Sequence, residues 1–297
     1  MNSLDYFAGV DAFIFNDFGG CTWAGENFLT YASNQGYLEL ACNNPGVVAV
    51  ILPEELASRC RELGKIPVIS SAPRVDFFEA FSRAVISGAY GVNCARSLSD
   101  DLLSGAGTFI DENVSVGQRV RIGKNCLILN GSIIEDDVVI HDNVIIGSEG
   151  MQTYISPSGG LQNVPHAGGV RIRKGVTLLQ GVNISKALYR EFTEIGQQSV
   201  ISIGASIGHG CVLGQRVQVS GGALIGGSTI IGDGAWIGPR ALIADGLVIG
   251  AAAKVRLGSV VVQNVPDQGD VSGNFALPHS MRLREFSLAK RKLREMK

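Results

Sequence analysis

The sequence predicts a mainly β protein: a parallel β-helix made of hexapeptide repeats, preceded by a small α/β domain and followed by a short helix. An aliphatic residue returns at every sixth position, a period that fits neither an α-helix nor an ordinary strand, and residues 1–100 lack it. Such repeats bury their apolar faces only by stacking coil upon coil. The two arrays are Ile110, Val116, Ile122, Ile128, Ile134, Ile140 and Ile146, and Ile195, Ile201, Ile207, Leu213, Val219, Ile225, Ile231, Ile237, Ile243, Ile249, Val255 and Val261.

Residues 1–100 are expected to form the α/β domain. Val47–Leu52 is a continuous apolar run of the kind found in buried strands, Pro53 is placed to begin a helix, and Ile66–Ile69 predicts another strand. Phe77 and Phe81 recur at helical spacing, which favours packing in a core. A chain of 297 residues has room for two domains.

Residues 101–270 are expected to form the β-helix. A small or β-branched residue stands four places after the aliphatic residues from Ile110 to Ile140 and from Ile195 to Ile237, and both must face one narrow core. Between them come residues that suit tight turns with positive φ, as in Ile122-Gly123-Lys124-Asn125. Each hexad therefore supplies one strand and one turn, and three hexads close a triangular coil.

Two insertions interrupt the period. The longer one covers residues 148–171, and a shorter one adds five residues around Ala187 to Glu191. Long loops inside a compact domain are usually functional or disordered, and insertions in a repeat protein project from it and build sites. We therefore expect substrate contacts there.

Residues 271–297 are expected to form a terminal segment and a basic helix. Phe286, Ala289, Leu293 and Met296 follow one another at spacings of three and four, which predicts one apolar helix stripe. The other positions are rich in Lys and Arg. Such a helix either steers an acidic partner or packs its stripe against other copies of the chain with its charges solvated.

Composition narrows the functional classes. The 6 cysteines lie far apart without a CxxC pair, which disfavours a disulfide framework or a zinc site and favours a reducing compartment. The N-terminus does not resemble a signal peptide, and no apolar run is long enough to span a bilayer. We expect a cytoplasmic protein without a metal. A net charge of −2 gives no reason to expect nucleic-acid binding.

Four motifs carry a resemblance to a known family. They are Tyr31-Ala32-Ser33-Asn34-Gln35-Gly36-Tyr37-Leu38, Ile146-Gly147-Ser148-Glu149-Gly150, Ile207-Gly208-His209-Gly210-Cys211 and Ser272-Gly273-Asn274-Phe275-Ala276-Leu277-Pro278-His279. Together they resemble the LpxD-like UDP-3-O-acylglucosamine N-acyltransferases of lipid A synthesis, over nearly the whole chain. The resemblance implies a left-handed β-helix, a homotrimer, a uracil held by the first motif, and a catalytic histidine in the third. Thymine would fit similar groups.

The chain also departs from that family. Gly246 stands where the family has a second active-site histidine, Ser202 and Ile203 replace an Asp-Asn pair, and Met151 replaces an aromatic residue. The family places these residues around the acceptor and the oxyanion. The departures therefore favour a relative that acts on another nucleotide-linked amino sugar.

The chain has 4 histidines, and His209 is the expected general base. It lies two places after Ile207, at a turn position that points out of the core, and histidine titrates near neutral pH. His166, in the longer insertion, is a candidate for acceptor binding. His141 adjoins a core aliphatic residue and is expected to be structural, and His279 to be incidental.

The remaining site residues fall into two groups. The nucleotide and sugar are expected at Tyr31, Asn34, Tyr37, Ser148, Glu149 and Tyr154, although the aromatic residues also suit ordinary packing. The pantetheine arm of acyl-CoA or of acyl carrier protein is expected at Gly226, Ala244 and Lys254, along the seam between subunits.

The sequence therefore predicts an N-acyltransferase that moves an acyl group from a thioester to the amine of a nucleotide-linked amino sugar. Two alternatives stay open: lipid A synthesis proper, and a non-catalytic assembly protein. A phosphate-binding enzyme is disfavoured because no G-x-x-x-x-G-K-[ST] motif occurs. A γ-type carbonic anhydrase would need zinc histidines five residues apart, a spacing that is absent.

Overall fold

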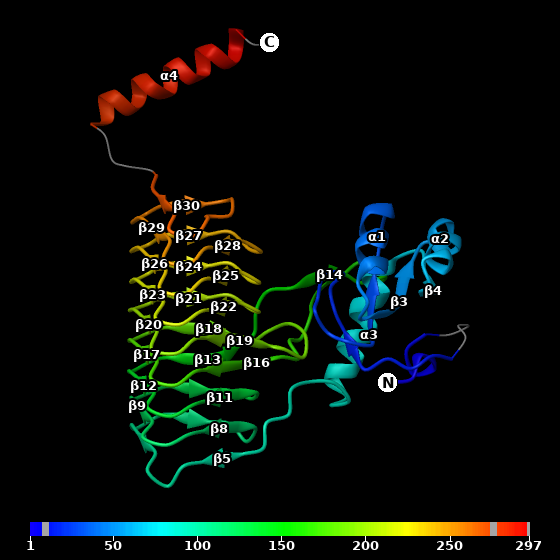
Figure 1. Ribbon diagram of the computed structural model, residues 1–297, viewed down its shortest axis with the longest axis horizontal. Helices are drawn as coiled ribbons and strands as arrows, with labels where there is room; N and C mark the ends of the chain where they lie inside the picture. Colours follow the sequence, from blue (N-terminus) through cyan, green and yellow to red (C-terminus); the bar gives the residue numbers. More distant parts are fainter. Residues whose placement is uncertain (8–11, 274–277, 296–297) are drawn as a thin grey trace.

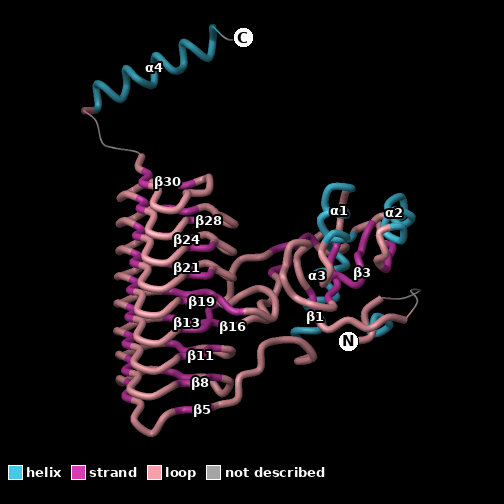
Figure 2. Tube along the Cα trace, viewed as in Figure 1, coloured by secondary structure: helices cyan, strands magenta, loops and turns pink. Residues whose placement is uncertain are grey.

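A computed structural model describes residues 1–7, 12–273 and 278–295 (Figure 1). It contains the predicted α/β domain, parallel β-helix and C-terminal helix. Helices occur at the two ends of the chain, while the β-helix consists of short strands joined by turns (Figure 2). The prediction of a mainly β fold with these three parts is confirmed.

The β-helix has three faces of parallel strands. Face 1 contains β5 (Ser97–Leu98), β8 (Val114–Val116), β11 (Ser132–Ile134), β16 (Gly169–Ile172), β19 (Phe192–Ile195), β22 (Val212–Leu213), β25 (Ile230–Ile231) and β28 (Val248–Ile249). Face 2 contains β6 (Leu103–Ser104), β9 (Arg121–Ile122), β12 (Val139–Ile140), β17 (Thr177–Leu178), β20 (Val200–Ile201), β23 (Gln218–Val219), β26 (Trp236–Ile237), β29 (Lys254–Val255) and β31 (Asp270–Val271). Face 3 contains β7 (Phe109–Ile110), β10 (Leu127–Ile128), β13 (Ile145–Ser148), β18 (Asn183–Ser185), β21 (Ser206–Ile207), β24 (Leu224–Ile225), β27 (Leu242–Ile243) and β30 (Val260–Val261).

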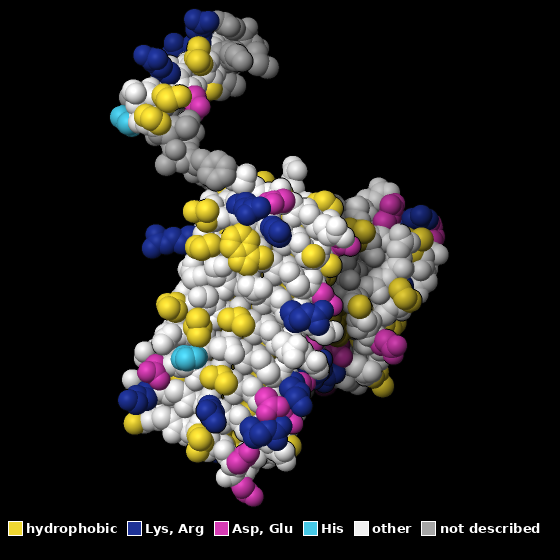
Figure 3. All heavy atoms as spheres, turned by 60° about the vertical axis from the view of Figure 1, so that its left-hand side comes forward, with side chains coloured by type: hydrophobic (Ala, Val, Ile, Leu, Met, Phe, Trp, Pro, Cys, Tyr) yellow, Lys and Arg dark blue, Asp and Glu magenta, His cyan; other side chains and the backbone are white. Residues whose placement is uncertain are grey.

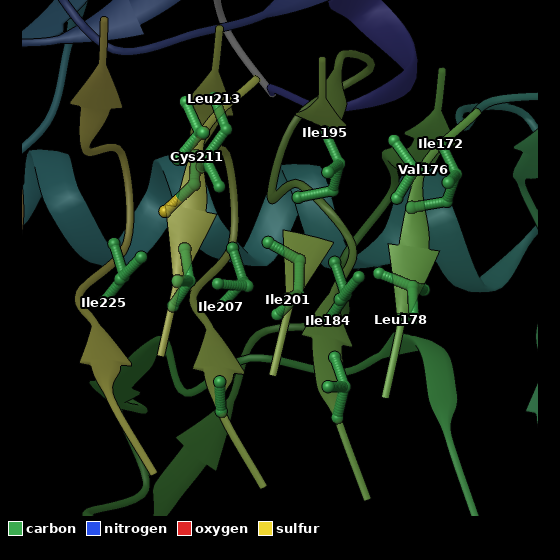
Figure 4. Packing of buried hydrophobic residues seen from close by; sticks show 14 of the residues in the cluster. Ile172, Val176, Leu178, Ile184, Ile195, Ile201, Ile207, Cys211, Leu213 and Ile225 are labelled. Atoms are coloured by element: carbon green, nitrogen blue, oxygen red, sulfur yellow. The ribbon is translucent and has the colours of Figure 1, made fainter. Parts of the chain in front are cut away.

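The period of six determines the core of the β-helix. The aliphatic residues of both arrays point inward and form one continuous cluster, with Ile110 only partly buried at its end. Figure 4 shows Ile184, Ile207 and Ile225 side by side on successive coils. The turns have positive φ as predicted, for instance 53° at Asn125 and 65° at Gly210. Gly, which has no Cβ, and Asn adopt this conformation more readily than other residues.

Both insertions leave the β-helix at the same corner. In the regular coils a residue pairs with the one 18 positions later, as Leu127 does with Ile145. Ile146 pairs with Ile184, and Ile184 with Ile207, so these two coils are longer. The extra residues lie in the turns from face 3 to face 1, which we call the insertion corner. The longer insertion forms a hairpin of β14 (Thr153–Ile155) and β15 (Leu161–Asn163).

The N-terminal domain is built on a parallel sheet of β1 (Asp17–Phe18), β2 (Phe28–Tyr31), β3 (Val47–Leu52) and β4 (Ile66–Ile69). A short helix η1 (Ser3–Asp5) precedes it. On β3, Val50 and Leu52 pack under α1 (Gln35–Asn43) and α2 (Ala57–Glu62), which follows η2 (Glu54–Leu56). Ala49 and Ile51 face α3 (Pro73–Ile86) and its buried phenylalanines. Both strand predictions and the helical core are confirmed.

The insertions attach this domain to the β-helix. Tyr154 and Leu188, one from each insertion, are buried in the same cluster as the phenylalanines of α3. Arg190 forms an ion pair of 2.8 Å with Asp17, and Arg74 of α3 donates a hydrogen bond of 2.6 Å to the carbonyl of Thr153. The α/β domain is therefore held beside the insertion corner.

The C-terminal helix α4 (His279–Glu295) lies beyond the last coil in Figure 1. Residues Asn274 to Leu277 of the fourth motif and Met296 of the predicted stripe lie outside the described residues, as do the side chains of Phe286 and Leu293. Within the described part of the chain, no helix is both long and apolar enough to cross a membrane. Hydrophobic side chains lie among charged ones on the outer surface of the β-helix (Figure 3).

Candidate active site

His209 stands at the insertion corner, in the turn between β21 and β22. Its side chain is half-buried and outside the core cluster, as its place in the hexad predicted. Glycines flank the imidazole on two sides. A Cβ on Gly227 would lie 2.6 Å from Nε2 of His209, and a Cβ on Gly150 would lie 3.0 Å from its Cδ2. Only glycine at these positions leaves room for the ring.

His166 comes from the longer insertion and lies against His209. The two ring centres are 5.4 Å apart, with an angle of 72° between the ring planes. The His166 ring is 0% exposed. Its Nδ1 lies 3.1 Å from Oε2 of Glu149 and 3.2 Å from the carbonyl oxygen of Val164. Its Nε2 is buried and has no hydrogen-bond partner among the described residues.

Glu149 joins this pair to a lysine. Its Oε2 accepts a hydrogen bond of 2.8 Å from the backbone N–H of His166, and its Oε1 lies 2.7 Å from Nζ of Lys186. Burial alone would raise the pKa of Glu149, but the hydrogen bonds from His166 and Lys186 outweigh it and lower that pKa to about 2. Glu149 is therefore an ionised carboxylate at physiological pH.

Burial also sets the charge of His209. It lowers the pKa of His209 below the usual 6.5, the nearness of His166 adds to the shift, and Asp245 opposes it only in part. At neutral pH the imidazole is mostly uncharged and able to accept a proton. That is the state a general base needs.

The α/β domain also contributes to this corner. Trp23 donates a hydrogen bond to Glu191 in the shorter insertion, and burial, the larger effect, raises the pKa of Glu191. A Cβ on Gly210 would lie 3.6 Å from Oε1 of Glu191, so this carboxyl group stands next to the turn of His209. The backbone N–H of Gly210 donates a hydrogen bond of 2.8 Å to Oγ1 of Thr193. The corner thus joins both domains.

The predicted nucleotide segment surrounds the start of α1. Asn34 is the N-cap of that helix, and its Oδ1 accepts a hydrogen bond of 3.1 Å from the backbone N–H of Tyr37. The Tyr37 side chain is 55% exposed. Tyr31 is half-buried against Phe77, at 5.0 Å between ring centres. Phe77 also contacts Tyr189 of the shorter insertion, so Tyr31 lies on the side of the domain that faces the β-helix.

The other predicted site residues do not all lie together: some are at the insertion corner and others are not. Ser148 lies in the corner, and its hydroxyl is 3.2 Å from that of Ser185. Tyr154 is buried, and its ring stacks on Phe78 at 6.2 Å, so its observed role is packing between the domains. Gly226 and Ala244 follow Ile225 and Ile243 at the insertion corner, on the two coils after His209. Lys254 is exposed on face 2, away from that corner.

Sequence reasoning missed Lys186, Gly227 and Gly150. Lys186 follows Ile184 by two positions, just as His209 follows Ile207, and Ile184 pairs with Ile207. Aligning the hexads by coil would have placed the lysine and the histidine on adjacent turns. Gly227 occupies the same position one coil later. The contact of Gly150 with both histidines had no signal in the sequence, because the path of the longer insertion creates it.

The other histidines and the cysteines lie elsewhere. His141 is half-buried at a turn between faces 2 and 3, and His279 is exposed at the start of α4. All 6 cysteines are free, and burial raises the pKa of the Cys211 thiol to about 11. Among the described residues, no three His, Cys, Asp or Glu side chains are grouped to hold a metal ion.

Comparisons with known proteins define the class of fold. Residues 119–149 match the bacterial transferase hexapeptide family, described by six repeats. The UDP-N-acetylglucosamine acyltransferase from Campylobacter jejuni is 20% identical, with 61% of this chain and 68% of that chain covered and a TM-score of 0.50. LpxA from Acinetobacter baumannii is 16% identical, with 66% and 75% covered and a TM-score of 0.54. The fold is thus a left-handed parallel β-helix of hexapeptide repeats. No curated protein matches the sequence.

Proposed function

We propose that this protein is an N-acyltransferase that moves an acyl group from a thioester carrier to the amine of a nucleotide-linked amino sugar. The observation that carries the proposal is the insertion corner. There a half-buried histidine of lowered pKa lies between two glycines, where the β-helix meets the α/β domain. The hexapeptide match supports it, as does the similar structure from Campylobacter jejuni, whose name describes an acyltransferase.

In the proposed reaction His209 is the general base. A thioester is already activated, so the attacking amine mainly needs to lose a proton while donors stabilise the oxyanion. The amine nitrogen forms a bond to the carbonyl carbon, and the C–S bond breaks. The amine proton passes to His209 and from there to the leaving thiolate. The products are an amide and a thiol, and the histidine returns to its neutral form.

The nucleotide is proposed to bind at Tyr31 and Tyr37. The side chain of Tyr37 is exposed and available for stacking on a base, and the Asn34 cap fixes where the helix that bears it begins. His166 lies against His209 and Glu149 contacts His166, so the amino sugar is proposed to approach from this side, with Ser148 in the same corner. The contact of Arg190 with Asp17 and that of Arg74 with Thr153 hold the α/β domain and the insertion corner in one arrangement.

The carrier is proposed to be acyl-CoA or acyl carrier protein, with its pantetheine arm along Gly226 and Ala244. Exposed apolar side chains on face 1 (Val212, Ile230, Val248) and face 3 (Leu224, Leu242, Val260) border this corner and support a homotrimer whose seams lie there. Lys254 would then contact the carrier from a neighbouring subunit. The six free cysteines favour a cytoplasmic location.

Mass spectrometry of the acylated product tests this function. The protein is offered acetyl-CoA or a 3-hydroxyacyl carrier protein, together with UDP- or dTDP-linked amino sugars, and the His209→Ala variant serves as the negative control. We expect a product in which the acyl group is joined by an amide bond to the amine of the nucleotide-linked sugar. Product only with UDP-3-O-acylglucosamine and the long-chain carrier would assign the protein to lipid A synthesis. Failure to bind any nucleotide sugar or thioester would favour the assembly protein instead.

A further inference from the structure

We propose that His166 is a positioning residue for His209: its Nε2 accepts a hydrogen bond from Nδ1–H of His209, so that Nε2 of His209 is left as the base. Glu149, His166 and His209 would then form a hydrogen-bonded chain that runs from the carboxylate through the first imidazole to the second. This inference rests on the proposed function for its catalytic meaning. Its structural part, the hydrogen bond and the tautomer that it selects, is tested independently of activity.

The neighbours of His166 determine which of its nitrogens carries a proton. Nδ1 faces the carboxylate of Glu149 at 3.1 Å and the carbonyl of Val164 at 3.2 Å, and both groups only accept hydrogen bonds. Nδ1 must therefore be the protonated nitrogen. In the neutral ring Nε2 is then a lone-pair acceptor, because the bond made by one nitrogen sets the state of the other.

The acceptor, Nε2 of His166, is fully buried and has no hydrogen-bond donor in the described structure. Nε2 of His166 has no hydrogen-bond partner among the described residues, and its ring is 0% exposed. Leaving a buried polar atom unpaired costs about 1–3 kcal/mol. Such atoms therefore usually have a donor close by.

His209 is placed to supply the donor. A Cβ built on Gly150 would lie 2.6 Å from Nε2 of His166 and 3.0 Å from Cδ2 of His209, so both atoms face the same point. Rotating the His209 ring by half a turn about its Cβ–Cγ bond exchanges Cδ2 for Nδ1 within the same volume. Nδ1–H would then face Nε2 of His166.

The distance between the rings fits this bond. Two imidazoles joined in line by an N–H···N bond of about 2.9 Å have centres about 5.3 Å apart, since each nitrogen lies about 1.2 Å from its ring centre. The observed separation of the His166 and His209 centres is 5.4 Å. A small movement of the His209 ring completes the bond without displacing the backbone.

The surrounding charges hold this hydrogen-bonded chain in place. Lys186 pairs with Glu149 at 2.7 Å, which keeps the carboxylate ionised and pointing at His166. Asp245 and Glu191 are the other titratable groups near His209. Glu149 orients His166, and His166 in turn orients His209. In catalytic triads a carboxylate fixes the tautomer of the catalytic histidine in the same way.

Nitrogen-15 NMR of the histidine side chains tests the bond directly. In the full-length protein we expect His209 to be the tautomer protonated at Nδ1, and in His166→Leu to shift to the tautomer protonated at Nε2. His166→Gln retains an acceptor near the position of Nε2 and should preserve the native tautomer. Protonation at Nε2 in the unsubstituted protein would overturn the inference, and this arm needs no variant to fold.

Kinetics test the catalytic meaning. With an acceptor found by the assay above, His166→Leu should lower kcat about 10- to 100-fold and leave KM for the nucleotide sugar unchanged, because the base loses its orientation. His166→Gln should recover most of the rate, and His141→Leu, elsewhere on the β-helix, should have no effect. A loss confined to KM would contradict a positioning role. If the unsubstituted protein transfers no acyl group, the proposed function fails while the NMR result still decides the hydrogen bond.

Discussion

Two clusters of charged side chains lie at the two corners that border face 1 of the β-helix, and they differ in how completely they are paired. In the first, Arg173 contacts Glu194 at 2.7 Å and Glu135 at 2.9 Å, so one guanidinium serves two carboxylates. In the second, Lys186 and Glu149 are paired, but Nε2 of His166 has no partner among the described residues, and His209 has a lowered pKa. The first arrangement stabilises the coils. The second contains a buried nitrogen that is unpaired among the described residues and a histidine with a shifted pKa, and such destabilising features are typical of reacting sites.

The largest difference between the clusters should appear when His209 is removed. His209→Ala is expected to lower kcat by about 10²- to 10⁴-fold, the range that a general base contributes. His141→Ala is the matched control, since His141 is also half-buried at a turn of the β-helix but lies away from the insertion corner. Steady-state rates measure both. Equal rates for His209→Ala and the unsubstituted protein would remove His209 from the mechanism.

Adding a methyl group at position 227, in Gly227→Ala, should displace the His209 ring without removing it. Its Cβ would lie 2.6 Å from Nε2 of His209, too close for the ring to keep its position. We expect Gly227→Ala to lower kcat about tenfold or more, since small misplacements of reacting groups have large effects on rate. Gly221→Ala is the control, because its Cβ would have 3.4 Å of space to the nearest atom. Comparable rates in the two variants would contradict the placement of the site.

The pH dependence should report His209 and not Glu149. The base must be neutral, so kcat/KM should be constant near neutral pH and fall as the pH drops below the pKa of His209, which burial places below 6.5. Glu149, with a pKa of about 2, stays ionised throughout that range. Protonating His209 also favours unfolding, because the unfolded chain takes up that proton at a higher pH. An acidic limb centred above 6.5 would argue for another base.

The smallest effect should come from the fully paired cluster. Arg173→Met is expected to lower the free energy of unfolding by about 1 kcal/mol, because its ion pairs are partly exposed and its removal leaves Glu135 and Glu194 without a cation. The loss should shrink in 1 M salt, where such pairs are screened. Urea unfolding at two salt concentrations measures it. A fall in the rate of acyl transfer would mean that this cluster also serves the reaction.

The sequence was sufficient for the β-helix because its signal is local and repeated. Each hexad contains an aliphatic residue that points inward and a turn that accepts positive φ. Ile128 and Ile225, from the two arrays, are both buried as this pattern predicts. The strands of the α/β domain, such as Val47–Leu52, were also predictable, because a continuous apolar run fits a sheet buried on both faces.

The site was only partly predictable, because its contacts join parts of the chain that the repeat does not relate. The hexad placed His209 outside the core. The path of the longer insertion decided that His166 would be buried against it and that Tyr154 would pack on Phe78. Local hydrogen bonding likewise gave the Oδ1 of Asn34 a capping role that the motif alone did not reveal.

Titrating the protein with a nucleotide-linked amino sugar, while following its histidine side chains by NMR, tests the central claim most directly. The account predicts that the resonances of His209 and His166 shift together with one binding curve, while those of His141 and His279 remain unchanged. A saturable shift at His141, or binding that leaves His209 unaffected, would contradict the assignment of the insertion corner as the reacting site.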